Sequence, residues 1–252
     1  MIVEIETKAQ NQYPLLPTGC EVTATSILLN SLIKSHNLNI STYKITNESL
    51  ADKIIKEQDP DPITNFCGNP YRAFIGSPYS KESFGIFHKP IYNLIKEVIY
   101  QDNENQHIEV IDLTQTNINK FKYLIKQNET KDYIESRLNY FENDDNNNNN
   151  GEEDFEILKN HMIFNNAPII IWMTLELKEP KITDEWFDIK NQSQPLYWVS
   201  PEHCATLSGF DEIENVVIIT DPHTGKIEKY PKNLFLKRWR QLGRQAVSVK
   251  LK

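Results

Sequence analysis

The chain has 252 residues, 39% of them hydrophobic and 25% charged, which suffices for one domain with a full hydrophobic core or for two small ones. Its formal net charge of −8 at pH 7 argues against nucleic acid or an anionic membrane as the main partner, because either requires a basic surface. No run of residues is long and apolar enough to span a bilayer; the best candidate, residues 168–177, has only the length of a strand.

The start of the chain carries no recognisable targeting signal. Residues 1–6 alternate apolar and acidic side chains, without the basic and apolar regions of a signal peptide. The sequence therefore fits a cytoplasmic protein as well as one from which a targeting segment has been removed. It carries no signature of an oligomeric state.

The first predicted helix runs to about residue 34. Thr18 and Glu21 have the spacing of a capping box, which places Thr18 at the N-cap and Cys20 at about the second position of the helix. The apolar residues that follow recur with the period of a helix and include Ala24, Ile27, Leu28 and Leu32.

Two further helices are predicted over residues 47–57 and 90–100, and a segment rich in glycine, proline and aromatic residues separates them. We interpret this segment, residues 62–88, as an ordered loop. Its aromatic side chains are candidates for one wall of a cleft, although aromatic packing beneath a long loop explains them equally well; they include Tyr71, Phe74, Tyr79 and Phe84.

A polar stretch occupies about residues 119–154, between a strand predicted over 107–113 and a short helix predicted over 155–164. It ends in two aspartates, an asparagine run over residues 146–150, and Gly-Glu-Glu. Because an asparagine run has no apolar surface to bury, we expect a surface loop here.

The second half of the chain is predicted to form strands over residues 168–177, 203–210, 216–220 and 226–230, followed by a helix over 234–242. The Asp-Pro-His-Thr-Gly segment that begins at residue 221 forms a turn between the last two strands. Helices first and mostly antiparallel strands afterwards indicate an α+β fold, with a cleft between the two halves.

Cys20 is the first candidate for a chemical role. A cysteine in the first turn of a helix faces unpaired backbone N–H groups and the positive end of the helix dipole, and both favour the thiolate and lower the pKa of the thiol. A cysteine nucleophile needs this at neutral pH. From position alone, a buried structural cysteine is about equally expected. The odd number of cysteines, Cys20, Cys67 and Cys204, leaves at least one thiol free.

His203 and Asp221 follow Cys20 in the order cysteine, histidine, carboxylate, which is the chain order of a papain-type nucleophilic site. His203 would act as a base toward the thiol and as an acid toward the leaving group. Asp221 would accept a hydrogen bond from the imidazole and fix its tautomer. Each alone has an ordinary explanation, as a half-buried histidine in a strand and an aspartate in a turn, so the hypothesis depends on the three together.

Gln12 lies eight residues before Cys20, where its amide could donate to a developing oxyanion together with the backbone N–H of Cys20. Gln10 is a rival for this role, and either glutamine taken alone is more often an ordinary surface residue. A zinc site has weak support, because the sequence holds no CxxC and no HExxH motif and adjacent strand residues point to opposite faces. Its conceivable ligands are Cys20, Cys67, His203 and Cys204.

Several of these segments resemble one family. Gln12 with the Leu-Pro-Thr-Gly-Cys-Glu of residues 16–21 is similar to the opening motif of the peptidase family thirty-nine-like bacterial cysteine peptidases, which are relatives of bacteriocin-processing peptidases. The Gly-x-Pro-Tyr of residues 76–79, followed by the Phe-Gly of 84–85, resembles their middle segment. His203 with the later Gly-Phe-Asp, and the Asp-Pro that begins at Asp221, resemble their His and Asp motifs. The resemblance covers roughly residues 10–247 in the right order.

The resemblance implies a single papain-like peptidase domain over residues 1–252, with an N-terminal helical half packed on a C-terminal antiparallel β-sheet and the active-site cleft between them. It implies a triad of Cys20, His203 and Asp221, with Gln12 as oxyanion donor and no metal or organic cofactor. The polar stretch at about 119–154 departs from the family pattern as an insertion. Relatives are often exported to the bacterial cell envelope.

The sequence therefore predicts a cysteine peptidase that hydrolyses a peptide or amide bond, in a peptide or protein substrate, through an acyl-enzyme. A transpeptidase or acyltransferase could use the same triad, with an amine in place of water resolving the acyl-enzyme. A third alternative is a catalytically silent binding module on the same fold, in which Cys20 would be unreactive. The sequence gives no cleavage preference.

Overall fold

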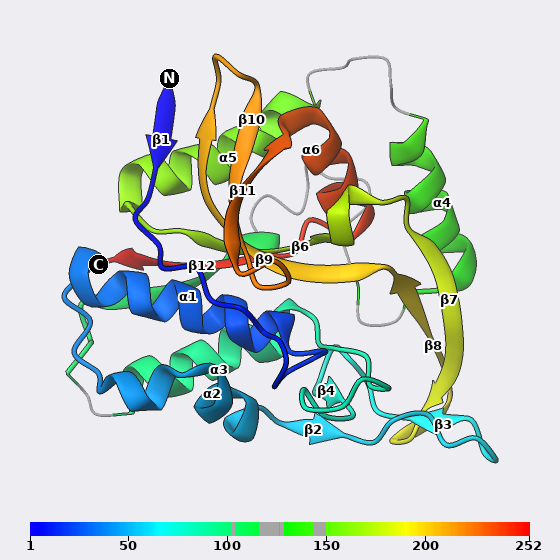
Figure 1. Cartoon of the computed structure of the whole chain (residues 1–252). Coiled ribbons are helices and arrows are strands. Elements are labelled where there is room, and N and C mark those ends of the chain that lie inside the picture. Colours follow the sequence, from blue (N-terminus) through cyan, green and yellow to red (C-terminus); the bar gives the residue numbers. More distant parts are fainter. Residues whose placement is uncertain (102–103, 116–125, 127–128, 144–149) are drawn as a thin grey trace.

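The structure is a computed structural model that describes residues 1–101, 104–115, 126, 129–143 and 150–252. Within these residues one large sheet has the strand order β11–β10–β9–β6–β12–β5, with β1 beside β9 (Figure 1). Every pairing in it is antiparallel, as the sequence predicted. Its strands are β1 (Ile2–Glu4), β5 (Ile108–Asp112), β6 (Ile169–Thr174), β9 (Glu202–Asp211), β10 (Val216–Asp221), β11 (Lys226–Pro231) and β12 (Ala246–Leu251).

Strand β9 lies in the middle of this sheet. Its first half pairs with β6, and its second half pairs with β10 on one edge and with β1 on the other. All residues from His203 to Asp211 are buried, because a strand with neighbours on both edges and helices on both faces has no surface left for water. A residue on β9 is therefore held on a rigid support.

Helices cover both faces of the sheet (Figure 1). Helix α1 (Cys20–Ser35) packs on β9 and β6, and α3 (His88–Tyr100) packs on β5 and β12 on the same face, with α2 (Asn47–Lys53) against α1. Helices α5 (Asn150–Asn165) and α6 (Lys232–Gln241) cover the other face, and α4 (Lys131–Glu142) packs beside α6. Each face has its own cluster of buried apolar side chains. This arrangement confirms the predicted α+β class, with the early helices packed on the sheet of the second half.

Two small sheets flank the main one, and none of their five strands was predicted. Strands β3 (Phe66–Cys67), β7 (Lys181–Asp188) and β8 (Asn191–Ser200) form one of them, and β2 (Lys56–Glu57) pairs with β4 (Phe74–Ile75) in the other. Three short 3₁₀ turns complete the described elements: η1 (Thr42–Ile45), η2 (Leu113–Gln115) and η4 (Leu175–Leu177).

The segment 62–88 was predicted as an ordered loop, and it differs from this prediction by containing the two-residue strands β3 and β4. Its aromatic side chains mostly pack inward. The ring centroid of Phe84 lies 4.9 Å from that of Trp186 and 5.5 Å from that of Trp198, and Phe74 is fully buried. Tyr79 is the exposed one, and its hydroxyl donates to Asp52 at 2.7 Å. These contacts favour aromatic packing beneath the loop over a cleft wall.

The prediction of a loop over about 119–154 was wrong in part. Helix α4 occupies residues 131–142, and α5 begins at Asn150 rather than near 155. Ile134, Leu138 and Phe141 form the buried side of α4, and this apolar spacing stabilises the helix against the sheet-covering α6. Asparagines 146–149 lie outside the described residues. The helix predicted over 47–57 also ends earlier, at Lys53.

Candidate functional site

Cys20 is the first residue of α1 and is 7% exposed. Gly19 stands at the N-cap, and no side chain caps the helix, so the predicted capping box does not form. The hydroxyl of Thr18 donates instead to the backbone carbonyls of Ser77, at 3.2 Å, and Ser80, at 2.9 Å. These bonds fasten the start of α1 to the loop that contains Ser77 and Ser80.

Glu21 is fully buried beside Cys20, rather than folded back on the helix terminus. Its Oε2 accepts a hydrogen bond from the Cys20 thiol at 3.4 Å, and its Oε1 accepts one from the backbone N–H of Ile86 at 2.8 Å. A partner from a distant loop has thus replaced the local capping partner that the spacing suggested. The sequence-based interpretation of Glu21 as a simple helix cap was wrong for this reason.

His203 and Asp221 form a buried pair. The imidazole Nε2 of His203, near the start of β9, lies 2.8 Å from Oδ1 of Asp221, the last residue of β10. Asp221 also accepts from the backbone N–H of His223 at 2.8 Å and from the hydroxyl of Tyr230 at 3.2 Å. Burial by itself raises the pKa of Asp221, but the hydrogen bonds from His203, His223 and Tyr230 and the charge of His203 together outweigh it, so the pKa of Asp221 lies below its usual value.

The thiol of Cys20 has a pKa well above its ordinary value. Burial is the main cause, and the neighbouring carboxyls of Glu21 and Glu202 add to it, while a hydrogen bond from the backbone N–H of Cys204 opposes it. The sequence predicted a lowered pKa from the helix terminus alone. That prediction was wrong chiefly because the thiol is buried, and further because the carboxyls of Glu21 and Glu202 lie close to the sulfur atom.

Cys20 and the His203–Asp221 pair belong to elements that pack directly on each other. Helix α1 lies on β9, and the N–H that reaches the Cys20 sulfur belongs to Cys204, the residue after His203. Among the hydrogen bonds of the described residues, none joins Cys20 to His203. In this structure the thiol is therefore bonded to Glu21, while the imidazole is bonded to Asp221.

Gln12 lies in the segment before α1, and its side-chain amide donates hydrogen bonds to backbone carbonyls. Its Nε2 donates to Leu16 at 3.3 Å and to Pro17 at 3.0 Å, which uses both hydrogens of the amide. Its Oε1 is buried and has no partner. Gln10 accepts a hydrogen bond from Ser26, deeper along α1, at 3.1 Å.

Two residues beside the histidine–aspartate pair were missed or misjudged from the sequence. The hydroxyl of Tyr13 lies 3.2 Å from Nδ1 of His223, and the ring of His223 stands edge-on to that of His203, with centroids 6.1 Å apart. The sequence marks His223 only as part of the turn that begins at residue 221, and the structure shows that its side chain is half-buried. No local pattern marks either side chain, because their contact joins segments 210 residues apart.

A family comparison gives this geometry its context. The family model described as "Peptidase_C39 like family" matches residues 2–247 of the chain. The chain belongs to this family. The match confirms the resemblance carried by the opening motif around Cys20 and by the His203 and Asp221 motifs.

Two relatives of this C39-like protein have been compared with it over most of their length. The uncharacterized protein YvpB of Bacillus subtilis (strain 168) is 23% identical over 244 residues, which cover 95% of this chain and 72% of YvpB. A crystal structure of a candidate C39-like peptidase from Bacillus anthracis is 21% identical and superposes with a TM-score of 0.65, covering 100% of this chain and 98% of the other. The second comparison establishes a shared fold.

Possible metal ligands of this C39-like protein gather at one place among the described residues. Ligand atoms of Cys20, Glu21 and Glu202 all lie within 4.8 Å of one another. This differs from the weakly supported zinc set of the sequence analysis. Cys67 belongs to β3, where its thiol donates to the carbonyl of Gln58.

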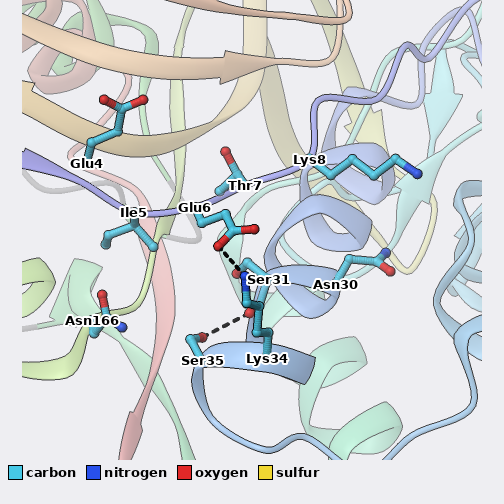
Figure 2. A pocket seen from close by; sticks show the side chains of 10 residues that line it. All are labelled: Glu4, Ile5, Glu6, Thr7, Lys8, Asn30, Ser31, Lys34, Ser35 and Asn166. Atoms are coloured by element: carbon cyan, nitrogen blue, oxygen red, sulfur yellow. Dashed lines mark hydrogen bonds and ion pairs between the residues drawn. The ribbon is translucent and has the colours of Figure 1, made fainter.

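A polar hollow of about 500 Å³ lies at the opposite end of α1 from Cys20 (Figure 2). Glu6 and Lys34 form an ion pair of 2.7 Å across it, and both side chains are largely exposed. None of the candidate site residues lines it; its lining is Glu4, Ile5, Glu6, Thr7, Lys8, Asn30, Ser31, Lys34, Ser35 and Asn166.

Among the described residues, no helix has both the length and the apolar character needed to cross a bilayer.

Proposed function

We propose that this C39-like protein is a cysteine peptidase that uses Cys20 as nucleophile, His203 as general acid and base, and Asp221 as the group that orients His203. The observation that carries the proposal is the buried 2.8 Å contact between His203 and Asp221 on strands that α1 covers, with Cys20 as the first residue of α1. Membership of the Peptidase_C39 like family supports the reaction class.

The tautomer of His203 follows from this contact. With Nε2 engaged by Asp221, Nδ1 is the ring nitrogen left to take the proton of a thiol. For this transfer the side chain of Cys20 must rotate from Glu21 toward His203, because its hydrogen bond in the resting structure is to Glu21. Rotation about a single side-chain bond is fast compared with turnover.

The proposed reaction has two halves. The thiolate of Cys20 attacks the carbonyl carbon of a peptide or amide bond, and the imidazolium of His203 gives its proton to the departing amine, which leaves an acyl-enzyme. Water then attacks the thioester while His203 takes a proton from it, and the acid product leaves as the thiol is restored. In this proposal the backbone N–H of Cys20, in the first turn of α1, donates a hydrogen bond to the oxyanion.

Gln12 is proposed as the second donor of a hydrogen bond to the oxyanion, which requires a change in its present hydrogen bonds. A glutamine amide that donates to the oxyanion must have a free N–H, and both hydrogens of the Gln12 amide are donated to Leu16 and Pro17. Gln12 can act as the second oxyanion donor only when one of these bonds is exchanged for the substrate oxygen. Gln10 lies against Ser26 instead, which favours Gln12 of the two.

A binding module without activity is the second candidate, and one observation favours it. The pKa of Cys20 is raised, and its thiol bonds to a carboxylate rather than to an imidazole. A degenerate site would keep this arrangement permanently, whereas a peptidase must leave it during each turnover.

The test is the rate of alkylation of Cys20 by iodoacetamide between pH 4 and 9, followed by peptide mapping. Cys67 and Cys204, both buried, serve as internal controls, and His203→Ala is measured in parallel. A peptidase is expected to show Cys20 alkylated faster than both controls, with this advantage lost in His203→Ala. Equal rates for the three cysteines at every pH would favour the binding module.

Hydrolysis is then measured with unfolded casein and Cys20→Ala as the matched inactive variant. An added amine separates the remaining alternative, since a transpeptidase would form an amide with it and a hydrolase would release the free acid. Loss of casein cleavage in Cys20→Ala is the expected result; cleavage that survives this substitution would overturn the assigned nucleophile.

A further inference from the structure

Glu21 is a fully buried acid next to the proposed nucleophile, and the proposed reaction does not use it. Both of its oxygens have specific partners: Oε2 accepts from the Cys20 thiol and Oε1 from the backbone N–H of Ile86. A carboxyl that only filled space would be replaced by an apolar side chain at lower cost, because burying an acid requires partners for its oxygens. The hydrogen bonds of Glu21 instead hold one carboxyl oxygen, Oε2, against the sulfur atom of Cys20.

The carboxyl group of Glu21 is tightly enclosed by neighbouring atoms. A Cβ atom added at Gly85 would lie 2.4 Å from Oε1 of Glu21 and 3.4 Å from Oε2 of Glu202. Any side chain at position 85 would therefore collide with Glu21, and the backbone of Gly85 forms one wall of its site. The neighbouring N–H of Ile86 then holds Oε1 in place, which leaves Oε2 facing Cys20.

The titratable groups around Glu21 come from two elements. Cys20 lies on α1 itself, and Glu202 and Cys204 face it from β9. Glu202 Oε1 is buried without a hydrogen-bond partner. Burial raises the pKa of Glu21 to about 7, against the opposing hydrogen bonds of its own backbone N–H, Ile86 and Cys20. The carboxyl therefore changes its charge near neutral pH.

The two charge states of Glu21 act oppositely on the sulfur. An ionised carboxylate accepts the thiol proton in a hydrogen bond and repels a thiolate, so it keeps Cys20 protonated. A protonated carboxyl exerts no such repulsion and can itself donate a hydrogen bond to a thiolate. The proton that the thiol loses passes to His203 in the proposed reaction, so the charge on Glu21 decides how readily that transfer occurs.

We propose that Glu21 is a positioning residue for the active cysteine: it holds the Cys20 thiol away from His203 in the resting state, and its carboxylate disfavours a thiolate beside it. This inference rests on the proposed function, since it assigns a role relative to the Cys20–His203 pair. It predicts a peptidase whose nucleophile becomes easier to ionise when Glu21 is replaced by an uncharged side chain of the same shape.

The test is Glu21→Gln, which keeps the shape of the side chain and an oxygen for the N–H of Ile86. The control is Glu6→Gln, an identical substitution at a side chain that is 79% exposed and paired with Lys34 at the far end of α1. Because the pKa of the Cys20 thiol lies well above its ordinary value, alkylation of Cys20 by iodoacetamide is measured from pH 5 to 11 in the wild type and in both variants. The circular dichroism spectrum at each pH checks folding.

In Glu21→Gln the midpoint of the rate–pH profile of Cys20 is expected to move to lower pH by at least one unit. Below the midpoint this raises the alkylation rate about tenfold for each unit, because the thiolate fraction rises by that factor. Glu6→Gln should follow the wild type. A folded Glu21→Gln whose profile coincides with the wild type, or shifts to higher pH, would overturn the inference, since a purely structural role alters stability without moving this midpoint.

His203→Ala separates this inference from the proposed function. If His203→Ala leaves the reactivity of Cys20 unchanged while Glu21→Gln shifts the profile, the triad is refuted and control of the thiol by Glu21 is supported. If His203→Ala abolishes the reactivity and Glu21→Gln has no effect, the triad is supported and the role of Glu21 is refuted.

Discussion

The buried carboxyl of Glu21 should make the stability of the protein depend on pH in a way that one substitution removes. Its pKa is 4.5 when exposed and about 7 in the folded protein, where burial disfavours its charge. Because the folded pKa is the higher one, the unfolded chain releases this proton first, and the folded state loses stability as the pH rises between these values. A difference of this size corresponds to about 3 kcal/mol, most of it lost between pH 5 and pH 8.

The assay is urea unfolding of the wild type and Glu21→Gln at pH 5, 6, 7 and 8. Buried histidines such as His161, whose pKa burial lowers to about 4, titrate in both proteins and cancel in the difference. Glu202 does not cancel, because burial and the charge of Glu21 both raise its pKa; removing the charge of Glu21 lowers that pKa and changes the difference in the same direction. The free energy of unfolding of Glu21→Gln, relative to the wild type, should therefore rise by about 2–3 kcal/mol across this range. A difference that stays constant with pH would show that Glu21 is ionised normally in the folded protein and would refute the reasoning.

Three further substitutions test other parts of the structure. Asp221→Asn should lower casein hydrolysis by about three orders of magnitude or more, because it keeps the hydrogen-bond geometry but removes the charge beside the imidazolium; retention of a tenth of the activity would contradict the proposed triad. Asp154→Ala should lower the free energy of unfolding by about 3–5 kcal/mol, since it removes the buried carboxylate that pairs with both Arg240 and Arg244, whereas Glu214→Ala, at an exposed ion pair, should leave urea unfolding unchanged. Leu28→Ala, in the core under α1, should cost about 2–5 kcal/mol in the same assay, and a loss below about 1 kcal/mol would contradict its burial.

Most of the elements that the sequence predicted correctly have strong apolar periodicity. Helix α1 and strands β6, β9 and β10 fall close to their expected positions, because each buries a set of apolar side chains. Strand β11 has no buried side chain, and the turn that begins at Asp221 marks its start instead. The pairing of His203 with Asp221 could also be anticipated, since β9 and β10 form an antiparallel pair with a short connection. In such a pair the two strand ends that are far from the turn lie side by side.

The elements that were missed have weaker local signals. Strands β7 and β8 are only partly buried and carry many charged or polar residues, so their pairing rather than their hydrophobicity defines them. Helix α4 does have apolar residues at helical spacing, Ile134, Leu138 and Phe141, but the asparagine run that follows it dominated the interpretation of the segment. The spacing of Thr18 and Glu21 fits a capping box, and only the distant N–H of Ile86 shows why none forms.

The chemistry of the candidate site was the part least accessible from the sequence. The position of Cys20 in a helix indicates a lowered pKa, and the structure reverses this direction chiefly by burying the thiol, with the carboxyls of Glu21 and Glu202 adding to the effect. Burial of the thiol and the approach of Glu202 from β9 both depend on tertiary packing. A local rule for helix ends cannot include them, because it describes the helix without its neighbours.

The packing of α1 on β9 has a consequence for the timing of biosynthesis. The hydroxyl of Thr206 donates to the backbone carbonyl of Ala24, across a separation of 182 residues. A ribosome that adds about 5–20 residues per second needs roughly 10–40 s to cover that separation. During this interval the nascent chain already carries Cys20 but has neither His203 nor Asp221. Under the proposed mechanism, the growing chain cannot cleave its own unfolded segments or those of neighbouring nascent chains, because the base that activates the thiol has not yet been made.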